Sequence, residues 1–133
     1  MSYASYKSLG KDPKAPQPET MADITRITSR DHRSALISKY PVVVIDNYTD
    51  WCRPCKLVAP HFAVLAQEYQ NKYPQHLIFA KENADDEFAG VPEIHGVPCF
   101  HFYVNGSHVK DLTATGGSID PVRENLKKIL HSK

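Results

Sequence analysis

Apolar and polar residues alternate along this chain in patterns that predict successive strands and helices from Ile24 onward. Residues 41–45 form an apolar run rich in β-branched side chains, which is typical of a strand buried on both faces of a sheet. Further along, an apolar stripe at helical spacing predicts a helix that ends near residue 70; its members are Val58, Phe62, Leu65, Ala66 and Tyr69. Pro60 lies inside this helix and predicts a bend, because proline removes one backbone hydrogen bond.

The next part of the chain predicts two more strands and a hairpin. Residues 76–81 and 98–104 are the predicted strands, and the polar stretch 82–95 between them can hold at most a short helix. Asn105-Gly106 follows the second strand and precedes another strand-like run, 108–112. This dipeptide between two apolar runs is the strongest short-range signal for a β-hairpin.

A last helix is predicted from about Asp120, with Asp120 as its N-cap and Pro121 at its first position. One face of this helix is apolar and is formed by Val122, Leu126, Ile129 and Leu130. The complete order is strand, helix, strand, helix, strand, a possible short helix, two strands and a helix. Parallel strands joined by helices and followed by an antiparallel hairpin predict an α/β protein, with a mixed central sheet flanked by helices on both faces.

Length and composition fit one intracellular enzyme domain. The chain has 133 residues, 41% of them hydrophobic, which is enough to bury a core. Its 16 basic and 15 acidic residues give a formal net charge of +1, so nucleic acid is not an expected partner. No apolar run approaches the roughly 18 residues that span a bilayer, so we expect no membrane association.

The first residues differ from the rest of the chain. Pro13, Pro16 and Pro18 lie among Lys, Asp, Gln and Glu, and such a segment can neither form a helix nor bury much area. We therefore expect residues 1–21 to be a disordered tail rich in Pro and Lys, and residues 22–133 to be the folded domain. The tail has neither the apolar segment of a signal peptide nor the arginines of a mitochondrial presequence.

The chemistry of the chain centres on Cys52 and Cys55, which directly follow Trp51 at the predicted start of the long helix. A Cys in the first turn of a helix lies near unpaired backbone N–H groups and the positive end of the helix dipole, which stabilise a thiolate. The second Cys, one turn later, can attack a mixed disulfide formed by the first. The pair therefore predicts a redox-active dithiol.

Two other interpretations of this Cys pair are weaker. A zinc site needs a second ligand pair, but the only other cysteine, Cys99, is accompanied by His95 and His101 at irregular spacing. We therefore expect no metal. A structural disulfide framework would need more than three cysteines and an extracellular route.

Asp46 is a second candidate catalytic residue, since it ends the buried strand six residues before Cys52. Burial of a carboxylate raises its pKa toward neutrality, which suits general acid/base catalysis. The alternative is a solubilising charge at the end of a strand.

These motifs together resemble the thioredoxin family over about residues 22–133. The matching positions occur in the order that the family has and are Asp46, Trp51-Cys52-Arg53-Pro54-Cys55-Lys56, Pro60, Lys81, Gly96-Val97-Pro98 and Asn105-Gly106. The resemblance implies a thioredoxin fold and a protein-disulfide reductase in which Cys52 attacks and Cys55 resolves. It also implies that Asp46 carries a proton for Cys55 through water, while Lys81 tunes the charge of Asp46.

The resemblance further implies how substrate binds. A cis Pro98 is expected opposite the disulfide, where the backbone of Val97 would pair with an extended peptide. The residues expected to contact substrate are Trp51, Arg53, Pro54, Val97, Pro98, Gly116 and Gly117. For Trp51, ordinary core packing is the alternative.

Three positions depart from the usual pattern of the family. Arg53 replaces the common Gly, Tyr48 stands where Trp or Phe is usual, and Cys99 takes the place of a typical Thr. Cys99 is expected to be a small buried hydrophobe, with a third redox thiol as the alternative.

By the same resemblance the protein is expected to be a cytoplasmic monomer that serves electron transport and cell redox homeostasis. It would need no cofactor besides the Cys52–Cys55 disulfide. Its expected partners are disulfide-bearing client proteins and a flavin-dependent reductase that returns electrons. The competing function is a binding module of the same fold that holds a partner protein without using the dithiol.

Overall fold

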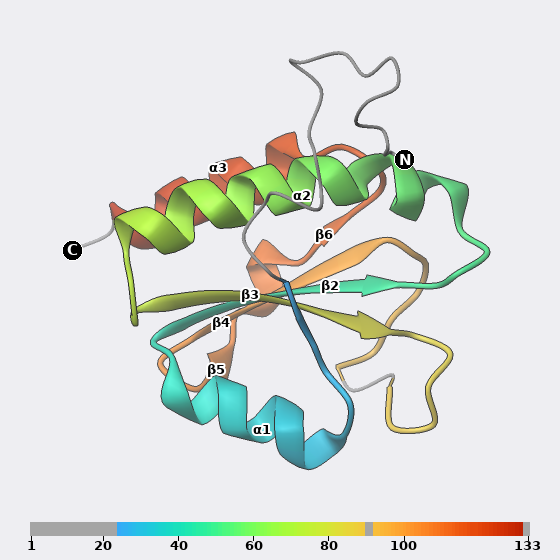
Figure 1. Ribbon diagram of the computed structural model, residues 1–133, viewed down its shortest axis with the longest axis horizontal. Coiled ribbons are helices and arrows are strands. Elements are labelled where there is room, and N and C mark those ends of the chain that lie inside the picture. Colours follow the sequence, from blue (N-terminus) through green and yellow to red (C-terminus); the bar gives the residue numbers. More distant parts are fainter. Residues whose placement is uncertain (1–23, 90–91, 132–133) are drawn as a thin grey trace, which may run out of the picture.

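The structure is a computed structural model that describes residues 24–89 and 92–131; the predicted tail, residues 1–21, therefore lies outside the described residues. A central sheet separates helices α2 and α3 on one face from α1 on the other (Figure 1). In chain order the elements are β1 (Thr25–Arg26), α1 (Arg30–Lys39), β2 (Val42–Tyr48), α2 (Arg53–Lys72), β3 (Leu77–Asn83), β4 (Cys99–Val104), β5 (Ser107–His108), the short 3₁₀ helix η2 (Lys110–Leu112), β6 (Ala114–Thr115) and α3 (Asp120–Leu130).

The sheet is mixed, as the sequence predicts. Its strands lie in the order β1-β3-β2-β4-β5, and β6 also pairs with β4. β2 is parallel to β3 and antiparallel to β4, so it lies at the centre. This position agrees with the apolar run that marks β2 as a strand buried on both faces.

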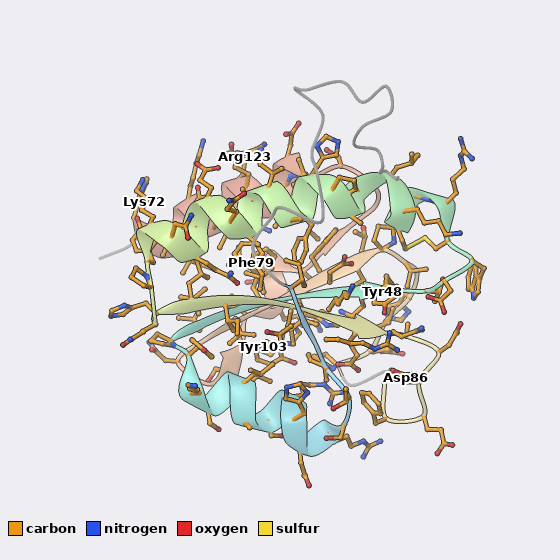
Figure 2. The ribbon with its side chains drawn as sticks, in the orientation of Figure 1. Tyr48, Lys72, Phe79, Asp86, Tyr103 and Arg123 are labelled. Atoms are coloured by element: carbon orange, nitrogen blue, oxygen red, sulfur yellow. A yellow bond between two sulfur atoms is a disulfide. The ribbon has the colours of Figure 1, made fainter. Side chains whose placement is uncertain are left out.

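Each face of the sheet has its own apolar core. Phe79 lies between β3 and α2 (Figure 2) and packs against the ring of Phe62 with their centroids 5.1 Å apart. Tyr103 lies on the opposite face, in the core that α1 covers. There, buried Arg33 of α1 forms two hydrogen bonds with Glu82 of β3 and a third with the carbonyl of Phe88. The Arg33 side chain thus joins α1, the sheet and the loop after β3.

The Asn105-Gly106 hairpin is confirmed, but its second strand is shorter than predicted. Both turn residues have positive φ, 51° and 87°, as a tight turn of the favoured hand requires. β5 ends at His108, and a 3₁₀ turn replaces the rest of the expected strand 108–112. The backbone N–H of Val109 still reaches the carbonyl of Phe102, so the chain leaves the sheet only after this bond.

Other element boundaries differ slightly from the prediction. Helix α2 begins at Arg53 and contains Pro60, as expected. In α3, however, the N-cap is Ile119 and not Asp120; the Asp120 carboxylate instead accepts a hydrogen bond from Arg123. The short strand β6 was not predicted, since two residues carry no periodicity. None of the helices among the described residues is long and apolar enough to cross a membrane.

Candidate active site at the first turn of helix α2

Cys52 and Cys55 form a disulfide at the start of α2, with their Cα atoms 5.3 Å apart. Cys52 is the N-cap of the helix, and its Sγ accepts a hydrogen bond from the backbone N–H of Cys55 at 3.1 Å. The backbone N–H of Cys52 donates to the carbonyl of Thr49, which anchors the loop after β2. When the disulfide is reduced, the capping N–H and the helix dipole favour a thiolate on Cys52.

Solvent exposure does not separate the two cysteines in the disulfide form. Each is 4% exposed. What distinguishes Cys52 is therefore its position as the N-cap, which gives its sulfur a backbone N–H donor. Arg53 follows Cys52 in the sequence and is the first residue of α2. It is exposed, so its charged side chain is in contact with solvent.

The expected substrate-binding segment lies against the disulfide. The Val97–Pro98 peptide bond is cis, and the Val97 carbonyl oxygen is 3.6 Å from Cys52 Sγ. Pro98 is buried, while Val97 is partly exposed. The backbone of Val97 therefore borders Cys52 Sγ on a side that solvent reaches.

Gly116 and Gly117, which are expected to contact substrate, lie beside Pro98 and the start of α2. The backbone N–H of Gly116, which has a φ of 92°, donates to the carbonyl of Pro98 at 3.1 Å. A Cβ added to Gly117 would lie 3.3 Å from Cβ of Pro54. The pair thus joins the Pro98 segment to the disulfide turn, and a side chain at residue 117 would push against that turn.

Trp51 does not pack in the core, so that alternative is wrong. Its side chain is largely in solvent, with the residue 71% exposed, and its indole Nε1–H donates to Asp85 Oδ2 at 3.0 Å. The backbone N–H of Asp85 donates to Asn83 Oδ1, which holds the Asp85 backbone in place. The sequence reasoning did not identify Asp85, because nothing in the polar stretch 82–95 singles it out.

Asp46 is buried at 4% exposure near the C-terminal end of β2. Burial raises its pKa to about 7, and the charge of Lys81 partly opposes this shift. Lys81 is the register partner of Asp46 across β2 and β3, and its Nζ lies 5.9 Å from the ring centre of Tyr48. Lys81 therefore lies beside Asp46 on the neighbouring strand.

A cavity of about 210 Å³ connects Asp46 with the disulfide. Asp46, Thr49, Cys55 and Lys81 are among the residues that line it. Within the described residues, the buried atoms Asp46 Oδ1 and Thr49 Oγ1 have no protein hydrogen-bond partner. The cavity therefore offers two polar atoms and enough room for water between the carboxyl group and Cys55. The sequence reasoning did not identify Thr49.

Cys99 is buried at 2% exposure, as predicted. Burial raises the pKa of its thiol, and Asp46 adds to the effect. Cys99 Sγ lies 3.5 Å from Nε2 of buried His101, and the side chain of Asn47 reaches both residues. Two features of the sequence could have pointed to these residues. Asn47 is a polar residue in the strand that the apolar run 41–45 begins, and His101 is a polar residue inside the apolar run of β4.

Within the described residues, no group of three or more His, Cys, Asp or Glu side chains is arranged to hold a metal ion. Cys99, His95 and His101, the residues weighed as zinc ligands, do not form such a group. His95 is exposed and lies 3.4 Å from Glu93 instead.

Comparison with known proteins adds independent information. The sequence model of the family described as Thioredoxin matches residues 23–128. Over 108 residues the chain is 34% identical to thioredoxin-like protein 1 of Schizosaccharomyces pombe, an alignment that covers 80% of this chain but only 36% of that protein. It is 35% identical over 98 residues to a thioredoxin of Neurospora crassa, covering 72% of each.

Solved thioredoxin structures also resemble this fold. The solved structure of thioredoxin f2 from Chlamydomonas reinhardtii superposes with a TM-score of 0.68 and 27% sequence identity. The alignment covers 84% of this chain and all of that one. The similarity therefore extends over most of the described sheet and helices.

Proposed function

This chain belongs to the thioredoxin family, and we propose that Cys52 is its attacking thiol and Cys55 its resolving thiol. As a member of that family it is a thiol–disulfide oxidoreductase that reduces protein disulfides. The observation that carries the assignment of the two thiols is the hydrogen bond from the Cys55 backbone N–H to Cys52 Sγ. It gives Cys52 the better stabilised thiolate.

The reaction proceeds in two exchanges. The Cys52 thiolate attacks one sulfur of a substrate disulfide, which forms a mixed disulfide and releases the other substrate sulfur as a thiolate. Cys55, once deprotonated, attacks Cys52 Sγ and releases the second substrate sulfur. Two electrons and two protons pass to the substrate, and the Cys52–Cys55 disulfide remains.

Asp46 is the proton carrier for the second exchange. Its carboxyl group lines the same cavity as Cys55, and with a pKa of about 7 it can accept and return a proton near neutral pH. Through water in this cavity, Asp46 takes the Cys55 proton and delivers it to the departing substrate thiolate. Lys81 limits the rise in the pKa of Asp46, so that the base form remains populated.

The substrate peptide binds along the backbone of Val97, which lies beside Cys52 Sγ. Backbone pairing of this kind gives affinity without strong sequence preference. The exposed surface around this segment is formed by Trp51, Arg53, Pro54, Gly116 and Gly117. These residues contact the side chains that flank the substrate disulfide.

The folded domain comprises residues 22–133, and residues 1–21 are a tail outside it. The protein acts as a monomer in the cytoplasm, where it contributes to electron transport and redox homeostasis. Its partners are disulfide-bearing client proteins and a flavin-dependent reductase that restores the dithiol. The disulfide itself is the only redox group that this chemistry requires.

Reduction of insulin by dithiothreitol tests the assignment of the two thiols. Cys52→Ser should abolish the catalysed rate, whereas Cys55→Ser, reduced and then mixed with insulin after dithiothreitol is removed, should form a mixed disulfide that peptide mapping locates at Cys52. Cys55→Ser is the matched control, because both variants lose the internal disulfide. A mixed disulfide at any other cysteine would reverse the roles, and a wild-type rate that does not depend on either cysteine would indicate a binding module instead.

A further inference from the structure

Asn47, Cys99 and His101 form a buried hydrogen-bond network next to Pro98. Asn47 Nδ2 lies 3.0 Å from the carbonyl oxygen of Cys99 and 3.0 Å from His101 Nδ1. His101 Nε2 lies 3.5 Å from Cys99 Sγ. We infer that Asn47 and His101 are positioning residues that hold the substrate-binding backbone of Val97 and Pro98 against the active-site disulfide.

The carbonyl of Cys99 determines which groups donate in this network. A carbonyl oxygen can only accept, so the Asn47 amide must present its NH₂ group to it. The same NH₂ group then donates its second hydrogen to His101 Nδ1, which must be unprotonated. The neutral His101 ring therefore carries its hydrogen on Nε2 and donates to Cys99 Sγ.

This network reaches the substrate-binding segment through the backbone. Asn47 and Cys99 are the last register pair of β2 and β4, and Pro98, the next residue, has no N–H to continue the ladder. The Asn47 side chain bonds the Cys99 carbonyl from the β2 side, while the Gly116 N–H bonds the Pro98 carbonyl from the β6 side. The backbone leading back to Val97 is thus held from both neighbouring strands.

The surroundings fix the network in place. Asn47, Cys99 and His101 are each 2% exposed, and buried polar groups are stable only when they are hydrogen-bonded. The His101 ring also packs edge-on against His108, with the ring centroids 5.1 Å apart. Because strand residues alternate between faces, Asn47 lies on the α1 face, whereas Asp46 lines the cavity on the α2 face. The network is therefore separate from the proton path.

The inference rests on the proposed binding of substrate backbone at Val97, and it predicts a selective defect. We would reduce wild-type protein, Asn47→Leu and His101→Leu, and mix each with insulin or with 5,5′-dithiobis(2-nitrobenzoate), a small disulfide without a peptide backbone. The rate constant for insulin should fall about 3- to 10-fold in both variants, the loss expected for a broken buried hydrogen bond. The rate constant for the small disulfide should stay unchanged, because Cys52 and its helix N-terminus are untouched.

Phe102→Leu is the matched control, since Phe102 is a buried residue of the same strand on the other face. It should destabilise the protein without changing the ratio of the two rate constants. An equal loss with both substrates, or no loss with insulin, in the two network variants would overturn the inference. If Cys52→Ser reacted with both disulfides as fast as the wild-type protein, the proposed function would be refuted instead.

A measurement on the wild-type protein keeps the inference testable even if both variants fail to fold. Long-range ¹H–¹⁵N NMR at neutral pH distinguishes the two neutral tautomers of His101. The network requires the hydrogen on Nε2. A hydrogen on Nδ1, or a charged ring, would show that Asn47 does not bridge Cys99 and His101.

Discussion

Asp46 and Lys81 are register partners at the centre of the sheet, a buried carboxyl group beside a lysine on the neighbouring strand. Burial raises the pKa of Asp46 more than the charge of Lys81 lowers it, and the result is a pKa of about 7 against the usual 3.8. The carboxyl group therefore changes its charge near neutral pH. Both the stability of the fold and the rate of proton transfer should follow this change.

Asp46→Asn should stabilise the protein at high pH. A pKa that is raised in the folded state contributes stability below about pH 4, and this contribution is lost as pH rises through about 7. Each pKa unit corresponds to about 1.4 kcal/mol, so we expect a gain of about 2 to 4 kcal/mol at pH 9 and little gain at pH 4. Urea unfolding at the two pH values measures the difference. An equal gain at both would mean that ionisation of Asp46 is not its source.

Lys81→Met should shift the pH dependence of disulfide resolution upward. Removal of the lysine leaves burial unopposed, so the pKa of Asp46 rises further. Decay of a mixed disulfide between the protein and a fluorescent peptide, followed from pH 6 to 9, reports this step. Asp46→Asn should slow the decay at least about tenfold and remove the Asp46-dependent inflection. A profile that Lys81→Met leaves unmoved would exclude the coupling.

His101 should contribute stability that is lost in acid. Burial and the neighbouring His108 lower its pKa from 6.5 to about 4. The charge of Arg33 also lowers this pKa, whereas a hydrogen bond with the backbone of Glu93 raises it. Asn47 and Cys99 contact the His101 ring. A lowered pKa in the folded state means stability that is present above about pH 6.5 and is lost as pH falls toward 4. The loss should amount to about 2 to 3 kcal/mol.

His101→Leu should remove the His101 contribution, so that the stability of this variant rises as pH falls from 7 to 4, and urea unfolding over this range checks it. In the same range Asp46 contributes a slope of the opposite sign, because its pKa is raised. The wild-type profile should therefore be flatter than that of either single variant. A His101→Leu profile that coincides with the wild-type profile would assign the titration to another group.

Alkylation of the reduced protein at mildly acidic pH should label Cys52 first and Cys99 last. The Cys55 N–H and the helix N-terminus favour the Cys52 thiolate, whereas burial raises the pKa of Cys99. Mass spectrometry of time points gives the order.

Cys99→Ala should retain insulin reduction, and a disulfide that contains Cys99 after mild peroxide treatment would contradict its assignment as a buried, unreactive thiol.

Arg53→Gly should make the protein a somewhat stronger reductant. The Arg53 cation should stabilise the Cys52 thiolate and hence the reduced state, but its side chain is exposed, so salt should screen the effect. We expect a shift of at most about 30 mV in redox equilibration against glutathione, decreasing as salt rises. A more oxidising glycine variant would reverse the proposed role of the charge.

The sequence predicted those features that short-range pattern determines. The central strand β2, the long helix after Cys52 and the turn at Asn105-Gly106 all follow from local periodicity and turn chemistry, and each is confirmed. Gly116 could not be placed in this way, because its contact with Pro98 depends on the pairing of β4 with the unpredicted strand β6.

The network behind Pro98 could not be predicted for a similar reason. Asn47 and His101 are 54 positions apart in the chain, and they meet only because β2 and β4 pair in one particular antiparallel register. The hydrogen bond from Trp51 likewise involves Asp85, which belongs to a loop without periodicity. A residue pattern reveals which side chains are unusual, but the contacts between them follow from the register of the sheet.

The alternation of β2 has a consequence for protein engineering. Asp46 and Asn47 are adjacent in sequence but serve opposite faces of the sheet, one lining the cavity beside α2 and the other bonding Cys99. Deletion of one residue earlier in β2 would exchange the two side chains between the faces, whereas a substitution at either position alters one face alone. Redesign of proton transfer and of peptide selectivity can therefore proceed independently, provided that the length of this strand is preserved.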